Sequence, residues 1–296
     1  MNVSFAYLLG MIIGNGTIQR GANDTTVMIE LPHKNFITDN RDARLCTSAS
    51  LNDIRNYLEP VVSSSMTTTQ SQSVSRISFT KNNKDFLISE INRYLSNCSN
   101  HENMRIHEEL FNQSKDVRIA IMQGIADSTA YVRKSNRFFK PYEHRVYIEV
   151  PHNWYLVIDV CNFLKKLDIP VQTIDWAHPN MRDSRLVQYN KGNTNFWKKE
   201  HQIKIWVNEF LPIGFKVIHK QQALEELALE YKIFVEDEGK ILEEKTHKYY
   251  WDMREIRKNK PNHPSVNDEF IPEEIRDKQF SRWQDIAREL GYSEES

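Results

Sequence analysis

The sequence predicts an α+β protein built from two similar halves, each with the element order α-β-β-α-β-β-α, followed by a C-terminal extension. An apolar, helix-like run with a central glycine begins each half, and these glycines, Gly10 and Gly124, lie 114 residues apart. The stretches that follow each run alternate between strand and helix patterns in the same order. Because a repeated order indicates a repeated domain, we divide the chain at 1–112, 113–235 and 236–296.

The first half begins with a helix that passes into a strand within residues 7–18. Period-two alternation through Val27, Ile29 and Leu31 then predicts a strand. The later elements expected in this half are a short helix at 51–58, a loop at 63–75, a strand at 73–80 and an amphipathic helix at 85–95.

The second half repeats this order, beginning with the run at residues 121–132. The elements expected after it are a strand at 145–150, a helix at 154–167, strands at 171–176 and 202–210, and a helix at 221–234, with a polar loop at 179–194. The tail contains three prolines and ends in an amphipathic helix predicted at 273–290.

Composition is that of an ordinary soluble protein of 296 residues, with 40% apolar and 27% charged residues. No apolar run approaches the roughly 18–20 residues that span a bilayer, so we expect no membrane partner. Cys46, Cys98 and Cys161 form no CxxC pair, which favours an intracellular protein. The cytoplasm or nucleoid is the expected location, with an organelle or nucleus left open.

The net charge of -1 is unevenly distributed along the chain. Residues 1–112 carry -1, residues 113–235 carry +5 and residues 236–296 carry -5. A basic middle region is compatible with a polyanionic partner, although a solvated protein face has the same composition.

The small residues of the two runs are four apart, Gly10 with Gly14 and Gly124 with Ser128. Residues at i and i+4 share one helix face. A glycine inside a helix costs roughly 1 kcal/mol relative to alanine, so it usually has a packing reason. We therefore expect the two small faces to form a domain interface. The alternative is two unrelated core helices.

The amino-acid sequences of the two runs favour the paired arrangement. Residues 8–16, LLGMIIGNG, resemble the LAGLIDADG signature of homing endonucleases and their relatives, and residues 122–130, MQGIADSTA, resemble it less closely. This resemblance implies two pseudo-symmetric domains whose motif helices pack together. It also implies saddle-shaped antiparallel sheets that straddle the major groove of DNA, in a chain that acts as a monomer.

In the LAGLIDADG family the eighth motif position is an acidic residue that binds Mg²⁺ for phosphodiester hydrolysis. Here these positions are Asn15 and Thr129, and neither is a carboxylate. Asn15 is either the natural residue of a protein that does not cut or an isosteric Asp-to-Asn inactivation. Asp127, two residues before the second position, either reaches the metal site or solvates the helix end. We accordingly expect Asn15 and Asp127 to be the metal and catalytic residues.

The family also places basic residues near the scissile phosphates. Lys81 and Lys220 occupy matching places before the last helix of each half, so the resemblance implies a catalytic role for both. DNA contacts fall to polar and basic side chains of the sheets. The candidates are Gln19, Arg20, Arg44, Arg76, Arg133, Lys134, Arg137, Arg145, Arg185, Lys198 and Lys199.

The sequence thus leaves two functions open. The first is a metal-dependent, site-specific double-stranded DNA endonuclease of the homing or restriction type. The second is a non-cleaving binder on the same scaffold, either an RNA maturase or a transcription factor. No HExxH or phosphate-binding GxxxxGK[ST] motif offers a competing chemistry.

Overall fold

The computed structural model describes residues 1–38, 42–62, 66–95, 98–134, 144–151, 153–175 and 200–238. The elements of the first half are α1 (Val3–Asn15), β1 (Gly16–Arg20), β2 (Asp24–Pro32), the 3-10 turn η1 (His33–Asn35), α2 (Ala43–Val62), β3 (Thr67–Gln70), β4 (Val74–Asn82), α3 (Phe86–Leu95), the 3-10 turn η2 (His101–Asn103) and α4 (Glu108–Phe111). The elements of the second half are α5 (Lys115–Thr129), β5 (Ala130–Arg133), β6 (Arg145–Pro151), α6 (Trp154–Lys165), β7 (Thr173–Asp175), β8 (Glu200–Trp206), α8 (Val207–Phe210) and α9 (Ile218–Glu238).

Each half contains one four-stranded antiparallel sheet, and the two sheets have the same strand order. The first sheet is ordered β1-β2-β4-β3 and the second β5-β6-β8-β7. In both, the motif helix passes directly into the first strand, so that α1 is followed by β1 and α5 by β5. The predicted α+β class and its antiparallel sheets are confirmed.

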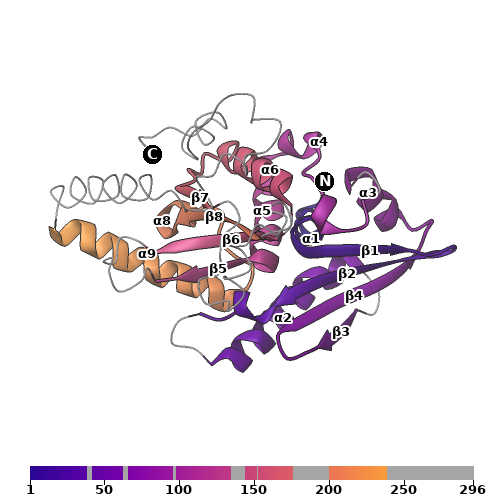
Figure 1. The fold of residues 1–296 in the computed structure, drawn as a ribbon, viewed down its shortest axis with the longest axis horizontal. Coiled ribbons are helices and arrows are strands. Elements are labelled where there is room, and N and C mark those ends of the chain that lie inside the picture. The colour runs from indigo at the N-terminus through magenta and orange to yellow at the C-terminus, as the bar shows by residue number, and fades with distance from the viewer. Residues whose placement is uncertain are drawn as a thin grey trace, which may run out of the picture.

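The two motif helices lie side by side near the middle of the molecule, with one sheet to each side (Figure 1). α1 is apolar along almost its whole length and is buried from Phe5 to Asn15. Its N-terminus is capped by the Asn2 side chain, which accepts a hydrogen bond from the Ser4 amide. At its other end the backbone becomes extended at Gly16, where β1 begins.

The core follows from period-two alternation in the strands. In β2 the buried apolar residues are Val27, Ile29 and Leu31, while those between them are partly exposed. The β4 residues Ile77 and Phe79 join them from the adjacent strand. These side chains and the motif helices form one continuous hydrophobic core that extends through both halves.

Two expected elements differ from those observed. The predicted loop at 63–75 contains β3, because the β-branched residues Thr67–Thr69 pair with β4 across a short turn. The predicted strand at 202–210 ends at Trp206 and continues as α8. Val207 and Phe210, three residues apart, are both buried, which is the spacing of a helix.

The predicted boundary at 112/113 falls in the turn between α4 and α5, whereas the one at 235/236 falls inside α9, which continues to Glu238. The predicted loop at 179–194 and terminal helix at 273–290 lie outside the described residues. Within the described ranges, no helix is both long and apolar enough to span a bilayer.

Candidate nucleic-acid interface

The small residues of the motif helices lie between α1 and α5. A Cβ atom added to Gly10 would overlap the Ile121 carbonyl oxygen, and one added to Gly124 would overlap the Tyr7 carbonyl oxygen. At the next turn, a Cβ added to Gly14 would lie 2.5 Å from Ser128 Oγ. Gly10, Gly14, Gly124 and Ser128 therefore lie where α1 and α5 approach each other, because only small side chains allow the two backbones to come this close.

Both helices end at the eighth motif position. Asn15 is the last residue of α1 and Thr129 the last of α5. The Asn15 Nδ2 donates a 2.9 Å hydrogen bond to the Glu30 carbonyl oxygen on β2. The Thr129 Oγ1 donates a 2.6 Å hydrogen bond to the Ile125 carbonyl within its own helix. The two side chains are thus used inside the protein, with exposures of 7% for Asn15 and 3% for Thr129.

These helix ends do not fit a divalent cation. Mg²⁺ selects hard anionic oxygen ligands, usually carboxylates. The ends offer an amide that donates to a carbonyl and a hydroxyl that donates to another. Over the ranges that the structure describes, no three His, Cys, Asp or Glu side chains come together as a potential metal site. The expectation that Asn15 and Asp127 hold Mg²⁺ is not supported by this geometry.

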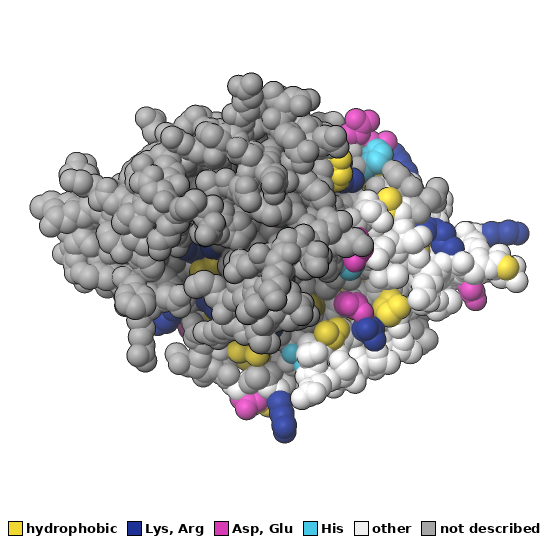
Figure 2. Space-filling model, viewed as in Figure 1, with side chains coloured by type: hydrophobic (Ala, Val, Ile, Leu, Met, Phe, Trp, Pro, Cys, Tyr) yellow, Lys and Arg dark blue, Asp and Glu magenta, His cyan; other side chains and the backbone are white. Residues whose placement is uncertain are grey.

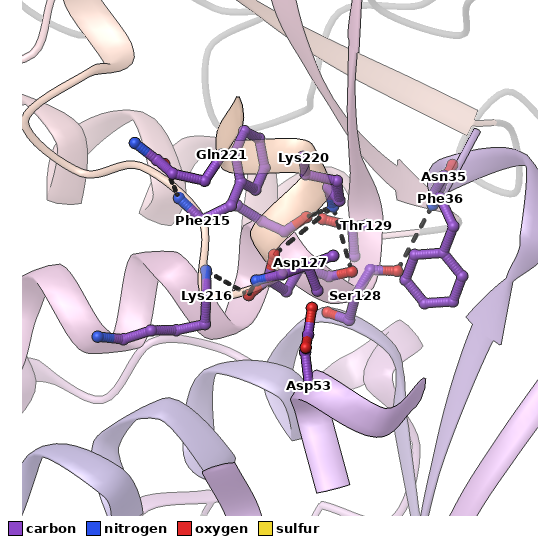
Figure 3. Close-up of polar contacts among 12 residues, drawn as sticks. Asn35, Phe36, Asp53, Asp127, Ser128, Thr129, Phe215, Lys216, Lys220 and Gln221 are labelled. Carbon is purple, nitrogen blue, oxygen red and sulfur yellow. Dashed lines mark hydrogen bonds and ion pairs between the residues drawn. The ribbon is translucent and has the colours of Figure 1, made fainter. Parts of the chain in front are cut away.

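Asp127 lies inside the protein, away from the helix tip. Because α5 continues to Thr129 without slipping in register, the Asp127 carboxyl faces the segment before α9 and is fully buried. Its Oδ2 accepts a hydrogen bond from the Lys216 amide at 2.9 Å (Figure 3). It also accepts hydrogen bonds from Tyr7 Oη at 2.9 Å and from the Val217 amide at 3.3 Å. The role predicted for Asp127 at the metal site is therefore corrected: it ties α1, α5 and the start of α9 together.

Lys220 is buried beside Asp127. Its Nζ lies 3.7 Å from Asp127 Oδ1 (Figure 3). It donates a hydrogen bond to the Ala126 carbonyl at 3.0 Å. Burial lowers the pKa of Lys220 to about 8, against the opposing effect of Asp127. Burial likewise raises the pKa of Asp127, while Lys220 and three hydrogen bonds act in the other direction. With no exposed surface, Lys220 cannot reach a phosphate in this conformation, contrary to its predicted catalytic role.

Lys81 also differs from its predicted place near the scissile phosphates. On β4 it follows Ile77 and Phe79 at period two, which puts it on the face of the sheet that carries the core. Its Nζ lies 3.7 Å from the Asp85 carboxylate at the start of α3. Lys81 and Lys220 therefore occupy different environments, one partly exposed and one buried.

The opposite face of the first sheet is open and mostly neutral. We call it the first outward face, and it consists of Thr17, Gln19, Thr26, Met28, Glu30, Thr67, Thr69, Arg76, Ser78 and Thr80. Its charged pair is Glu30 with Arg76, joined by a 2.6 Å hydrogen bond between Arg76 Nε and Glu30 Oε1. Figure 2 shows the surface over these strands as mostly white, the colour of neutral polar side chains and backbone.

The corresponding face of the second sheet is aromatic and basic. We call it the second outward face, and it consists of Tyr131, Arg133, Arg145, Tyr147, Glu149, Gln202, Lys204 and Trp206; Glu149 and Gln202 are buried, and the other members are at least partly exposed. The Tyr131 and Tyr147 rings stack at 5.0 Å, and the Arg133 guanidinium lies 4.6 Å from the Tyr131 ring centre. Arg145 lies over Trp206 at the same distance, 4.6 Å. These contacts hold planar cations in fixed orientations along the strands.

The predicted DNA-contacting residues separate into three groups. Gln19 and Arg76 lie on the first outward face, and Arg133 and Arg145 on the second. Three candidates lie elsewhere among the described residues. Arg20 hydrogen-bonds to Asn92, Ser99 and Cys98 on the helix-covered side of the first sheet. Arg44 is exposed in the first turn of α2, and Lys134 Nζ lies 2.8 Å from the Glu230 carboxylate. Arg137, Arg185, Lys198 and Lys199 lie outside the described residues.

Several residues of these faces were not predicted as contacts. Tyr131, Tyr147 and Lys204 carry the ladder of rings and cations on the second outward face. The sequence pattern could have predicted their position, because Tyr131, Tyr147 and Lys204 alternate along their strands with buried apolar residues such as Val132 and Ile148 and so lie on the opposite side of the sheet. Glu149 was also missed; it is bound by Lys34 of the first half, with 2.6 Å between Lys34 Nζ and Glu149 Oε2.

Comparison with solved structures finds chains that resemble this one at low sequence identity. The crystal structure of I-DmoI in complex with DNA and Ca is 16% identical, with 72% of this chain and 90% of that chain covered and a TM-score of 0.40. A structure of mesophilic variants of the homing endonuclease I-DmoI is also 16% identical. The match covers 75% of this chain and 97% of that chain, with a TM-score of 0.39. Full-length DUF199/WhiA from Thermatoga maritima is 14% identical. The match covers 98% of this chain and 86% of that chain, with a TM-score of 0.44.

No protein-family model and no curated protein matches the sequence. The fold itself is defined by two motif helices that pack together between two four-stranded antiparallel sheets of the same strand order.

Proposed function

We propose that this chain binds double-stranded DNA with its two outward faces and does not hydrolyse it. The observation that carries the proposal is the state of the two motif-helix ends. Asn15 and Thr129 stand where LAGLIDADG nucleases have metal-binding acids, and both side chains donate hydrogen bonds within the protein. The scaffold is retained, while the groups that would perform hydrolysis are not.

The outward faces supply the chemistry of groove recognition. A sheet face presents side chains in rows, and Arg, Gln and hydroxyl groups are the ones that bond to base edges and phosphates. Arg133 and Arg145 are steered by the aromatic rings beneath them, so less conformational freedom is lost when they bind. Their positive charge also favours a polyanion over a neutral ligand.

A nuclease is the second candidate. It is favoured by the setting of Asn15, because Leu8, Gly10 and Gly16 match the LAGLIDADG signature directly, and Asn is isosteric with Asp. Against it stands the Asn15 Nδ2 hydrogen bond to the Glu30 carbonyl. An ionised Asp cannot donate that bond and would place two acceptor oxygens together. Asn is thus the residue that this position suits.

Fluorescence anisotropy with a pool of random duplexes at low salt tests binding. We expect the affinity to fall steeply with added salt, as counterion release requires. Arg133→Ala on the second outward face should weaken binding roughly ten-fold. The matched control is Arg93→Ala: Arg93 is also exposed but is bonded to Glu109 at 2.7 Å on the helix-covered side. Absence of duplex binding, or equal effects of the two substitutions, would contradict the proposal.

A further inference from the structure

The first outward face offers hydroxyls, methyl groups and one amide where a phosphate-binding surface would offer cations. Its Glu30–Arg76 pair is internally neutral, because Arg76 Nε lies 2.6 Å from Glu30 Oε1. Thr26 and Thr80 hydrogen-bond across the strands at 2.8 Å, as do Thr67 and Ser78 at 2.8 Å. In its described residues such a face lacks the free cations that bind phosphates, whereas its hydroxyl, methyl and amide groups can contact the uncharged edges of bases.

The dimensions of this face suit the major groove. The major groove is about 12 Å wide and admits a two-stranded β-ribbon, so the neighbouring strands β1 and β2, about 4.8 Å apart, can enter it together. Outward residues on one strand are about 6.8 Å apart, which corresponds to about two base-pair steps of 3.4 Å. The β2 residues Thr26, Met28 and Glu30 would therefore follow about four steps of a groove.

The choice of side chains discriminates between bases. Glutamine pairs with the N6 and N7 edge of adenine, and apolar groups contact the C5 methyl of thymine. Gln19 is exposed at the end of β1, while Met28 and the threonines provide the apolar groups. Guanine is read mainly by arginine. Among the described residues of this face the sole arginine is Arg76, which Glu30 already engages.

Resting on the proposed function, we infer that the first outward face reads an A·T-rich half-site. Gln19 is its principal specificity-determining residue and selects adenine. The second outward face carries Arg133, Arg145 and Lys204 and binds a half-site of different composition. The target of this chain is consequently asymmetric, with one half recognised by neutral groups and the other by cations.

Selection of bound duplexes from a randomised library, with the full chain and the variant Gln19→Ala, tests this inference. Gln70→Ala is the matched control: Gln70 is an exposed glutamine of the same sheet, but it pairs with the buried Ser75 and so lies on the opposite face. We expect one half of the selected site to be A·T-rich. Gln19→Ala should lose roughly ten-fold in affinity at an adenine of that half, whereas Gln70→Ala should behave as the unmodified protein.

A second readout uses the ligand. Replacing thymine by deoxyuridine in the A·T-rich half removes only the C5 methyl groups, so binding of the unmodified protein should weaken several-fold. Specific binding without an A·T-rich half, or with no base preference altered by Gln19→Ala, would overturn the inference and leave the proposed function standing. Failure to bind any duplex would overturn both. Thermal melting of each variant verifies that it is folded.

Discussion

The Lys220 ammonium lies 3.7 Å from the Asp127 carboxylate, and neither side chain has any exposed surface. This pair connects the end of motif helix α5 to the first turn of α9, while the Tyr7 hydroxyl adds the other motif helix. An aspartate and a lysine, which are common residue types in catalytic sites, thus form a buried ion pair that stabilises the fold, and we call this pair the brace. The brace holds the helix pair on which both sheets depend.

Asp127→Asn should lower the free energy of unfolding by roughly 3–5 kcal/mol, because it leaves the Lys220 charge buried without its partner. The double variant Asp127→Asn/Lys220→Met removes both charges and should recover part of this loss. Urea unfolding measures both. Asp53→Asn, which changes one exposed hydrogen bond to the Ile218 amide, is the control and should have a small effect. Equal stability of Asp127→Asn and the unmodified protein would contradict the brace.

Stability should also depend on Lys220 above neutral pH. The pKa of Lys220 is lowered to about 8 in the folded protein, whereas an unfolded lysine titrates near 10.4. Between these values the unfolded chain binds more protons, so stability rises with pH by at most about 1.4 kcal/mol per unit. We expect the unfolding free energy of the unmodified protein to increase relative to Lys220→Met from pH 8 to 10. If the difference in unfolding free energy between the unmodified protein and Lys220→Met stayed constant or fell over this pH range, the lowered pKa of Lys220 would be contradicted.

Gly124→Ala should destabilise the protein by about 2–4 kcal/mol, because the new methyl group would overlap the Tyr7 carbonyl and force the motif helices apart. Gly21→Ala is the control. In the turn between β1 and β2, its added Cβ would lie 2.8 Å from Asp24 Oδ1, the end of a side chain that can rotate away, and 3.1 Å from the Asp24 carbonyl oxygen, so we expect a smaller cost than at Gly124. Thermal unfolding compares the two, and a Gly124→Ala protein as stable as Gly21→Ala would argue against close helix packing.

The fold was largely predictable because its signals are local. Small residues at i and i+4 marked the helix pair, and alternation at Val27, Ile29 and Leu31 marked β2. β3 was missed because a run of threonines beside serines has loop composition and becomes a strand only when β4 pairs with it. Tertiary pairing decided that segment.

The candidate site was less predictable because it depends on distant contacts. Asp127 and Lys220 are 93 positions apart, and nothing in the local sequence of either indicates that α9 begins against the end of α5. Lys81 was different. Counting by two from Ile77 and Phe79 already places it on the core face, so its position was within reach of the sequence pattern.

The most direct test of the central claim is a cleavage assay of the unmodified protein and Asn15→Asp on the duplexes they bind, with Mg²⁺ or Mn²⁺. The account predicts that both proteins retain salt-sensitive binding and leave the DNA intact, because Thr129 supplies no second acid and Asp127 remains buried. Metal-dependent double-strand cuts by Asn15→Asp would contradict it and identify the chain as an inactivated nuclease.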